Sequence, residues 1–185
     1  MIFMPEFLTN IDISILLYIQ ESIRMSWLTP VVVFITSLGN AGIFWVILSL
    51  ALLVPKKTRM IGCISFLALF GSLLVNNLLL KNLVGRIRPY DACSTLLPLV
   101  AKPTDYSFPS GHTGSSFASA CVLYHHLPKK AGIPMLVLAV LISLSRLYVG
   151  VHYPSDVLAG ILTGIGSGCL AEWLFQKYYI RTGGL

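Results

Sequence analysis

Long apolar runs joined by short basic connections constrain the fold of this chain more than any other feature. The most continuous runs cover about residues 60–83, 132–144 and 154–175. A helix needs ~20 predominantly apolar residues to cross a bilayer. Only 11% of the residues are charged and the mean hydropathy is +0.81, whereas soluble domains are roughly one-quarter charged. The sequence therefore predicts an integral membrane protein and excludes an ordinary soluble domain.

The N-terminal segment, residues 1–24, mixes apolar and polar positions. Ile11, Ile15 and Ile19 share one face of a helix, whereas Asp12 lies on another. This pattern predicts an amphipathic helix that lies at the membrane interface or packs on the bundle. The alternative is that the segment forms the first half of a kinked first span.

The remaining apolar runs complete the predicted bundle. Residues 41–54 and 109–127 are predicted to be further spans, whereas residues 27–38 are too short to cross a bilayer alone. That short run must lean on the preceding helix or enter the membrane only partway. The predicted fold is all-α, a polytopic membrane helix bundle of about six helices, with about five clear spans plus the N-terminal amphipathic or kinked helix. With 185 residues, the chain is predicted to be a single domain, 1–185.

Basic residues are distributed unevenly between the two sides of the predicted bundle. Alternate connections share a side, and one side collects Lys56, Lys57, Arg59, Lys129, Lys130, Lys177 and Arg181. By the positive-inside rule, that side is cytoplasmic. The opposite side carries cations that run against the rule, namely Lys81, Arg86, Arg88, Lys102 and Arg146. They predict a functional site on the extracytoplasmic face of a multi-pass cell-membrane protein, and their position at helix ends argues against nucleic acid as a partner.

Three separated segments meet on this outer face and together carry the chemistry of a phosphate site. They are Lys81-x6-Arg88-Pro89, Pro109-Ser110-Gly111-His112 and Ser145-Arg146-x5-His152-x3-Asp156. A phosphoryl group in transfer spreads negative charge over its oxygens, and Lys81, Arg88 and Arg146 can neutralise that charge. Ser110 and Gly111 open a helix whose first backbone N–H groups bind anions, and the Ser110 hydroxyl adds a donor.

Two histidines and an aspartate remain in these segments. Asp156 follows His152 by four positions, within reach across a helix start. A carboxylate that accepts from one ring nitrogen leaves the other nitrogen of a neutral imidazole free to attack. We therefore predict that His152 is the nucleophile that forms a phosphohistidine, that Asp156 orients it, and that His112 is the general acid. Each segment alone has an ordinary explanation, such as a packed histidine or a capped helix start, and only the combination is specific.

The same residues argue against a metal cofactor. His112, His152 and Asp156 could supply ligands, but the three neighbouring cations would repel a divalent ion. The cysteines show neither a disulfide framework nor the spacing of a metal site. The sequence therefore predicts no cofactor and no metal.

Small residues on the last span bear on the oligomeric state. Gly160, Gly164 and Gly168 form a seam that lets helices pack closely. We predict packing within the chain in preference to a dimer contact, and hence a monomer or a weak homodimer. His125 and His126 lie at the other end of their span and are predicted to be interfacial.

The three segments resemble the signature motifs of the type 2 phosphatidic acid phosphatase family, and every signature position is filled. The resemblance covers about residues 36–175, with the motifs within 81–156. It implies a membrane fold of about six helices and metal-independent removal of phosphate from lipids through a phosphohistidine. His152 is similar to the family's nucleophile, His112 to its general acid and Asp156 to its orienting acid. The spans argue against the family's soluble acid phosphatases and against the related vanadate haloperoxidases.

Other kinds of protein share some of these features. A membrane transporter or a lipid-binding protein could use the phosphate pocket without hydrolysis, but a transporter is expected to carry its charges near mid-span. An intramembrane serine protease using Ser110 and His112 would leave the cations and Asp156 unexplained. The loops are too short for a capping domain, so the pocket should open to the bilayer. Candidate substrates are undecaprenyl diphosphate, phosphatidylglycerol phosphate, phosphatidate and lipid A phosphate, with a slight preference for a prenyl diphosphate in a bacterial membrane.

Overall fold

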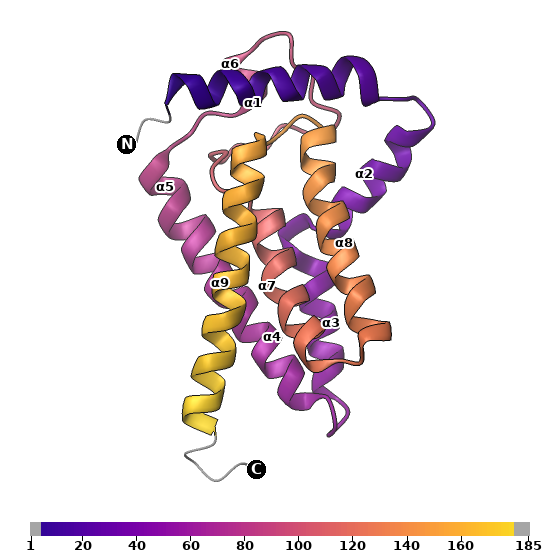
Figure 1. Cartoon of the computed structure of the whole chain (residues 1–185), viewed down its shortest axis with the longest axis vertical. Coiled ribbons are helices and arrows are strands. Elements are labelled where there is room, and N and C mark those ends of the chain that lie inside the picture. Colours follow the sequence, from indigo (N-terminus) through magenta and orange to yellow (C-terminus); the bar gives the residue numbers. More distant parts are fainter. Residues whose placement is uncertain (1–4, 180–185) are drawn as a thin grey trace.

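The computed structural model describes residues 5–179 of the chain (Figure 1). Residues 1–4 of the predicted N-terminal helix, and Arg181 of the predicted cytoplasmic group, lie outside the described residues. Within 5–179 the regular elements are all helices: α1 (Glu6–Tyr18), η1 (Ile19–Ile23), α2 (Leu28–Leu38), η2 (Asn40–Gly42), α3 (Ile43–Leu53), α4 (Arg59–Ser72), η3 (Leu73–Leu80), α5 (Lys81–Val84), α6 (Pro89–Ala92), α7 (Gly111–His126), α8 (Lys129–Tyr148) and α9 (Pro154–Tyr179). The prediction of an all-α membrane helix bundle is confirmed.

The helices differ in whether they are long enough to span a bilayer. Within the described residues, three helical runs are long and apolar enough to span a bilayer: Arg59–Ala92, Lys129–Tyr148 and Pro154–Tyr178. A fourth span is completed only if α2 and α3 count together, because that pair is bent by 47° at a short break. Helix α7 has only 16 residues, which is short for a bilayer.

The break between α2 and α3 has a local cause. Ala41 and Gly42 have positive φ angles of 49° and 65°. That region of backbone conformation suits glycine and strains alanine, and it cannot continue a right-handed helix. Helix α2 packs chiefly on α8. The apolar residues 27–38 therefore join the following helix at a sharp bend and do not lean on the preceding one.

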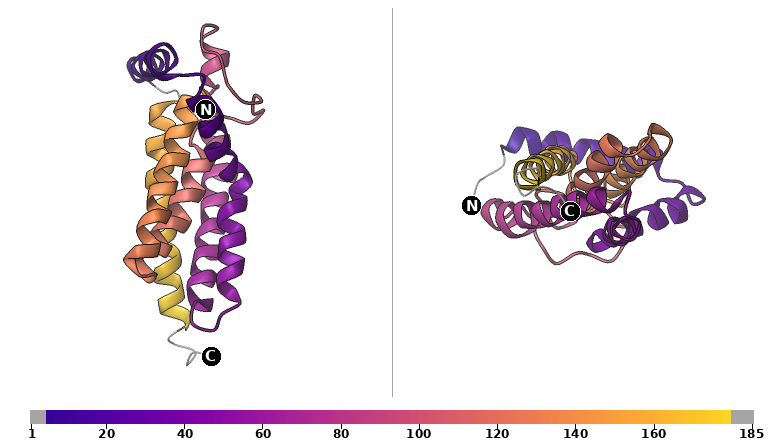
Figure 2. Two further views of the ribbon diagram at one scale, coloured as in Figure 1. Left: turned by 90° about the vertical axis from the view of Figure 1, so that its right-hand side faces the viewer. Right: turned by 90° about the horizontal axis from the view of Figure 1, so that it is seen from below.

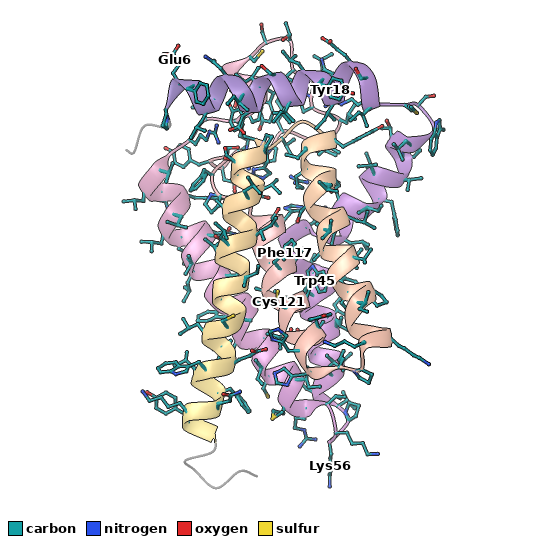
Figure 3. The ribbon with its side chains drawn as sticks, in the orientation of Figure 1. Glu6, Tyr18, Trp45, Lys56, Phe117 and Cys121 are labelled. Carbon is teal, nitrogen blue, oxygen red and sulfur yellow. The ribbon has the colours of Figure 1, made fainter. Side chains whose placement is uncertain are left out.

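Helix α7 is the centre of the bundle and contacts α4, α8 and α9. A Cβ atom at Gly160, Gly164 or Gly168 of α9 would lie 2.8, 2.6 or 3.2 Å from a backbone carbonyl oxygen of α7 or its N-cap. Trp45 and Phe117 fill the apolar core beside this contact (Figure 3). The small-residue seam predicted from the sequence therefore packs within the chain.

The two ends of the bundle carry different connections. Figure 3 places Lys56, in the loop between α3 and α4, at one end, and both ends of α1, Glu6 and Tyr18, at the other. The connection between α7 and α8 lies toward the Lys56 end, and the loop that precedes α7 lies at the α1 end (Figures 1 and 2). Alternate connections thus lie at opposite ends of the bundle, as the sequence predicts.

Helix α1 lies crosswise over one end of the bundle, and Figure 2 shows it almost along its own axis. Asp12 and Leu16 are its buried residues. Ile11 and Ile15, which the sequence pattern places on an apolar face, remain 42% and 39% exposed. The helix therefore turns Asp12 and Leu16, and not Ile11 or Ile15, toward the bundle.

Candidate active site

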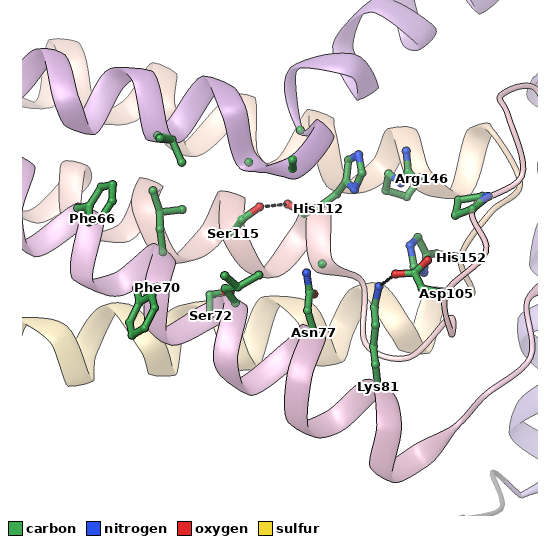
Figure 4. A pocket seen from close by; sticks show the side chains of 18 of the residues that line it. Phe66, Phe70, Ser72, Asn77, Lys81, Asp105, His112, Ser115, Arg146 and His152 are labelled. Atoms are coloured by element: carbon green, nitrogen blue, oxygen red, sulfur yellow. Dashed lines mark hydrogen bonds and ion pairs between the residues drawn. The ribbon is translucent and has the colours of Figure 1, made fainter.

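The three sequence segments lie together around one cavity near the α1 end of the bundle, seen from close by in Figure 4. Its volume is about 540 Å³. The predicted site residues that line it are Lys81, Arg88, Gly111, His112, Arg146 and His152. Ser110 and Asp156 do not line the cavity and are completely buried.

Arg146 brings an unpaired donor to the cavity wall. Its side chain belongs to α8 and is only 3% exposed. Its Nη1 donates to Oγ1 of Thr36 over 2.7 Å, whereas its buried Nε has no hydrogen-bond partner among the described residues. A buried donor without an acceptor costs ~1–3 kcal/mol, and an anion in the cavity would supply the acceptor.

Arg88 and Lys81 share one carboxylate, which belongs to Asp105. Arg88 donates through Nη2 to Asp105 over 2.6 Å and through Nη1 to the carbonyl oxygen of Val151 over 2.7 Å. Lys81 pairs with Asp105 from the other side (Figure 4). Burial acts to raise the pKa of Asp105, but the hydrogen bonds and charges of Lys81 and Arg88 outweigh it and lower the pKa to about 2. Asp105 is therefore ionised and lies where these two cations would meet a phosphate.

His152 lies in the short connection between α8 and α9. Its Nδ1 is 3.4 Å from Oδ2 of Asp156, and its Nε2 is 3.4 Å from Nη1 of Arg88. Burial, together with the smaller effects of the charges of Arg88 and Arg146, outweighs the hydrogen bond with Asp156 and lowers the pKa of His152 to about 4. The imidazole is therefore neutral at pH 7. With its proton on Nδ1, facing Asp156, its Nε2 carries a lone pair that accepts only the long contact from Arg88.

Asp156 is held by several donors at once. Its Oδ2 accepts from the Tyr153 backbone N–H over 2.9 Å and from the Ser107 hydroxyl over 2.5 Å. Its Oδ1 accepts from Nη1 of Arg86 over 2.7 Å. The carboxylate is fixed in place and can hold His152 in one orientation.

The start of α7 presents backbone to the cavity. Ser110 caps the helix, because its Oγ accepts from the Thr113 backbone N–H over 3.4 Å and from the Thr113 hydroxyl over 3.0 Å. The hydroxyl oxygen is therefore used as an acceptor within its own helix, and the donation of its O–H proton to phosphate stays a prediction. A Cβ atom at position 111 would lie 2.8 Å from Oδ1 of Asn77, so Gly111 permits the close approach of η3 to this helix start.

His112 faces the cavity from the first turn of α7. Its Nε2 is 3.0 Å from Oδ1 of Asn40, and Asn40 comes from the break between α2 and α3. A Cβ atom at Gly39 would lie 2.7 Å from Cδ2 of the His112 ring. The break thus makes room for the imidazole and supplies a hydrogen-bond partner that orients it.

A family model described as the PAP2 superfamily matches residues 61–180 of the chain. The chain belongs to the PAP2 superfamily. Among its PAP2 relatives, the undecaprenyl-diphosphatase of Sulfolobus acidocaldarius is 37% identical over 141 residues, which cover 76% of this chain and 68% of the relative. Phosphatidylglycerophosphatase B of Bacillus subtilis is 36% identical over 159 residues, which cover 77% of this chain and 73% of the relative.

Solved PAP2 structures share the fold. The crystal structure of a transmembrane PAP2 type phosphatidylglycerolphosphate phosphatase from Bacillus subtilis matches with a TM-score of 0.76 at 30% identity and covers 94% of this chain and 89% of that chain. Aquifex aeolicus LpxE matches with a TM-score of 0.77 at 25% identity and covers 88% of this chain and 95% of that chain. The predicted family and the prediction of a multi-pass membrane lipid phosphatase are confirmed.

Some residues of this PAP2 site were missed by reasoning from the sequence. Asp105 is the only acidic residue between Cys93 and Ser110, and its isolation in a loop beside a cationic motif was a usable signal. Asn40 follows Gly39 after the apolar run 27–38, and this pattern predicts only an end to the helix. Arg86 was counted among the cations of the outer face, and nothing in its spacing pointed to Asp156.

Proposed function

We propose that this PAP2 protein removes phosphate from a lipid phosphate or diphosphate monoester through a phosphohistidine, without a metal ion. One observation carries the proposal: the cavity is cationic at one end and apolar at the other. Lys81 and Arg146 lie at the first end, and Phe66 and Phe70 line the second (Figure 4). Arg88 belongs to the first end, because it donates to Asp105 there. A phosphate fits the cationic end, and a hydrocarbon chain fits the apolar end.

An apolar groove extends this path along the bundle. It shares Phe66 and Phe70 with the main cavity and is otherwise lined by Leu50, Leu53, Cys63 and Leu67. These side chains belong to α3 and α4, and Phe66 and Phe70 are 44% and 52% exposed. A lipid can therefore approach from the bilayer with its chain along α3 and α4 while its phosphate reaches His152. A water-soluble phosphate ester would leave this surface unused.

The proposed chemistry has two steps. In the first, Nε2 of His152 attacks phosphorus, an N–P bond forms, and the P–O bond to the leaving group breaks. His112 donates a proton to the leaving oxygen, while Asp156 stabilises the positive charge that develops on the His152 ring. In the second step, water attacks the phosphohistidine, His112 takes a proton from that water, and inorganic phosphate leaves with His152 restored.

The cations of the cavity have a separate part in the proposal. Lys81, Arg88 and Arg146 would bind the phosphate oxygens and stabilise the charge that they carry in the transition state. The phosphate then replaces Asp105 as the partner of Lys81 and Arg88. Its negative charge also favours the protonated form of His112 that the first step requires.

Among lipid phosphates, we favour a prenyl diphosphate such as undecaprenyl diphosphate. A relative with 37% identity is named undecaprenyl-diphosphatase, and the apolar path suits a long chain. Phosphatidylglycerol phosphate, phosphatidate and lipid A phosphate are the competing substrates. Purified protein should release inorganic phosphate from such lipids with a higher kcat/KM than from their water-soluble analogues. Binding of these lipids without phosphate release would instead favour the lipid-binding or transport alternative.

Chelators should leave this activity unchanged. Within residues 5–179, no group of three or more His, Cys, Asp or Glu side chains is placed to hold a metal ion, and the cations around His152 oppose a divalent ion. Phosphate release by a dialysed sample is therefore expected to be equal with and without excess EDTA. Loss of activity with EDTA, and its recovery on adding one divalent ion, would contradict the metal-independent mechanism.

The proposed orientation places the site outside the cytoplasm of a cell-membrane protein, and Cys93 can test it. Cys93 lies in the loop after α6, at the site end, and is partly exposed. Hydrogen bonds with Thr95 lower the pKa of its thiol, which favours the reactive thiolate. A membrane-impermeant maleimide should label intact cells, and Cys93→Ser should abolish that label. Labelling that requires lysis would show the opposite orientation.

A further inference from the structure

Arg86 joins two buried carboxylates that come from different helices. Its Nη1 donates to Oδ1 of Asp156 over 2.7 Å, and its Nη2 donates to Oδ2 of Asp12 over 2.8 Å. The exposed fractions of Arg86, Asp12 and Asp156 are 7%, 4% and 0%. Asp156 begins α9 beside His152, whereas Asp12 belongs to α1, which lies across the end of the bundle.

Further contacts fix this cluster. The Ser155 backbone N–H donates to Oδ1 of Asp12 over 3.0 Å, and the Ser155 hydroxyl also pairs with Asp12. Nη1 of Arg86 donates to Oγ of Ser155 over 2.7 Å, and the guanidinium lies 3.7 Å from the centre of the Tyr153 ring. None of these residues lines the cavity. Their one link to the proposed chemistry is Asp156.

A buried ionic cluster is a costly way to attach a helix. Replacement of a buried ion pair by packed apolar residues is often neutral or stabilising, and Leu16 already gives α1 an apolar contact. Attachment of α1 therefore does not explain the cluster, and its contact with Asp156 is the feature that needs a reason. Arg86 uses one arm to fix this carboxylate, and Asp12 satisfies the arm that would otherwise be buried without an acceptor.

We propose that Arg86 and Asp12 are positioning residues for the reaction, so that helix α1 is part of the active site. Arg86 fixes Asp156 in the orientation that holds His152, and Asp12 fixes Arg86. The inference rests on the proposed function, in which neutral His152 attacks phosphorus. The positive charge of Arg86 also disfavours protonation of His152, and the negative charge of Asp12 moderates that effect.

The pH dependence of kcat/KM separates this role from a purely structural one. The charged and titratable groups around the His152–Asp156 pair are Arg86, Arg88, Arg146, Asp12, Asp105, His112 and Tyr153. In the wild type, neutral His152 persists until the pH falls through about 4, so the acid limb lies well below pH 6.5. The same substrate is used for every variant, and its own ionisation therefore cancels in the comparison.

Arg86→Gln should lower kcat by about 10²-fold, the cost of a misplaced catalytic group, with little change in KM. Loss of the positive charge should also make His152 easier to protonate and move the acid limb of kcat/KM to higher pH, by about one unit. Arg86→Lys, which retains the charge with poorer geometry, should lower kcat without that upward movement.

Asp12→Asn is a nearly isosteric substitution. It distinguishes a positioning role from a purely structural one even where Arg86→Gln yields no folded protein. It should lower kcat, and its acid limb should not move to higher pH, because the lost charge is negative. Arg24→Gln is the matched control: Arg24 ties η1 to the carbonyl oxygens of Tyr148 and Leu97 over 2.9 and 2.7 Å and has no contact with Asp156. This control should retain the wild-type kcat and pH profile.

Two results would overturn the inference. One is a wild-type kcat in Asp12→Asn. The other is a fall in the activity of Arg86→Gln without a shift of the acid limb of kcat/KM, or with an equal upward shift of the acid limb in Asp12→Asn. A wild-type protein that releases no phosphate would instead contradict the proposed function itself.

Discussion

His152→Ala is expected to lower kcat/KM by about 10⁴-fold or more, the scale on which loss of a nucleophile acts in other hydrolases. Under the proposed mechanism the substitution removes the Nε2 lone pair that attacks phosphorus, so no covalent intermediate can form. The cations proposed to bind phosphate remain in place, because Arg88 and Lys81 are held by Asp105. Rapid-quench experiments with labelled lipid phosphate should trap an acid-labile phosphoenzyme in the wild type and none in the variant.

His126→Ala is the matched control for this experiment. It removes a histidine at the opposite end of α7, where Nε2 of His126 lies 3.3 Å from Glu172. Turnover and the phosphoenzyme should both persist in this variant. A phosphoenzyme that survives in His152→Ala but disappears in His112→Ala would reverse the two proposed roles.

The residue types of the site could be predicted from the sequence because the chemistry leaves few choices. Neutralising a phosphate requires Lys81, Arg88 and Arg146 or their equivalents, and an oriented imidazole requires a carboxylate such as Asp156. The contacts that support these residues could not be predicted. His112 meets Asn40 across 72 positions of the chain, and Arg86 meets Asp12 across 74. No helical period connects residues so far apart.

The fold, like the site, could be predicted from the sequence only in part. Apolar runs predict the helices that form the bundle, because a bilayer demands their length and composition. The orientation of α1 does not follow from its pattern. In a membrane protein an apolar face can turn outward to lipid, while a polar residue turns inward to a partner. Ile11 and Ile15 therefore stay exposed, and Asp12 is buried against Arg86.

The sequence predicts only part of the bend between α2 and α3, namely that the helix ends there. Gly39 and Asn40 interrupt the apolar run, which predicts an end to the helix. Whether the chain then turns away or continues across the membrane depends on packing. Here α2 packs on α8, and Arg146 of α8 bonds to Thr36 of α2. The bend is thereby held where Asn40 reaches His112.

His112→Ala is expected to lower kcat by about 10²–10⁴-fold on a lipid phosphate, the usual contribution of a general acid. The alkoxide or phosphate that leaves needs a proton, and His112 is the proposed donor. Asn40→Ala should cause a smaller loss in the same direction, because it removes only the group that orients the ring, 3.0 Å from its Nε2. Both variants retain His152 and should still form the phosphoenzyme, more slowly than the wild type.

The leaving group tests this assignment directly. A nitrophenyl phosphate releases a stabilised phenolate that needs no proton, so the loss in the rate of phosphoenzyme formation in His112→Ala should shrink on this substrate while the loss in His152→Ala stays complete. This rate is compared because the later step, in which His112 takes a proton from water, is the same for both substrates. An equal loss in this rate on both substrates would show that His112 binds phosphate or supports the fold and does not donate the proton. The two histidines face the same cavity, and a role shared between them would give His152→Ala the same dependence on the leaving group. A loss that depends on the leaving group in His112→Ala, but not in His152→Ala, is therefore the result that identifies His112 as the proton donor.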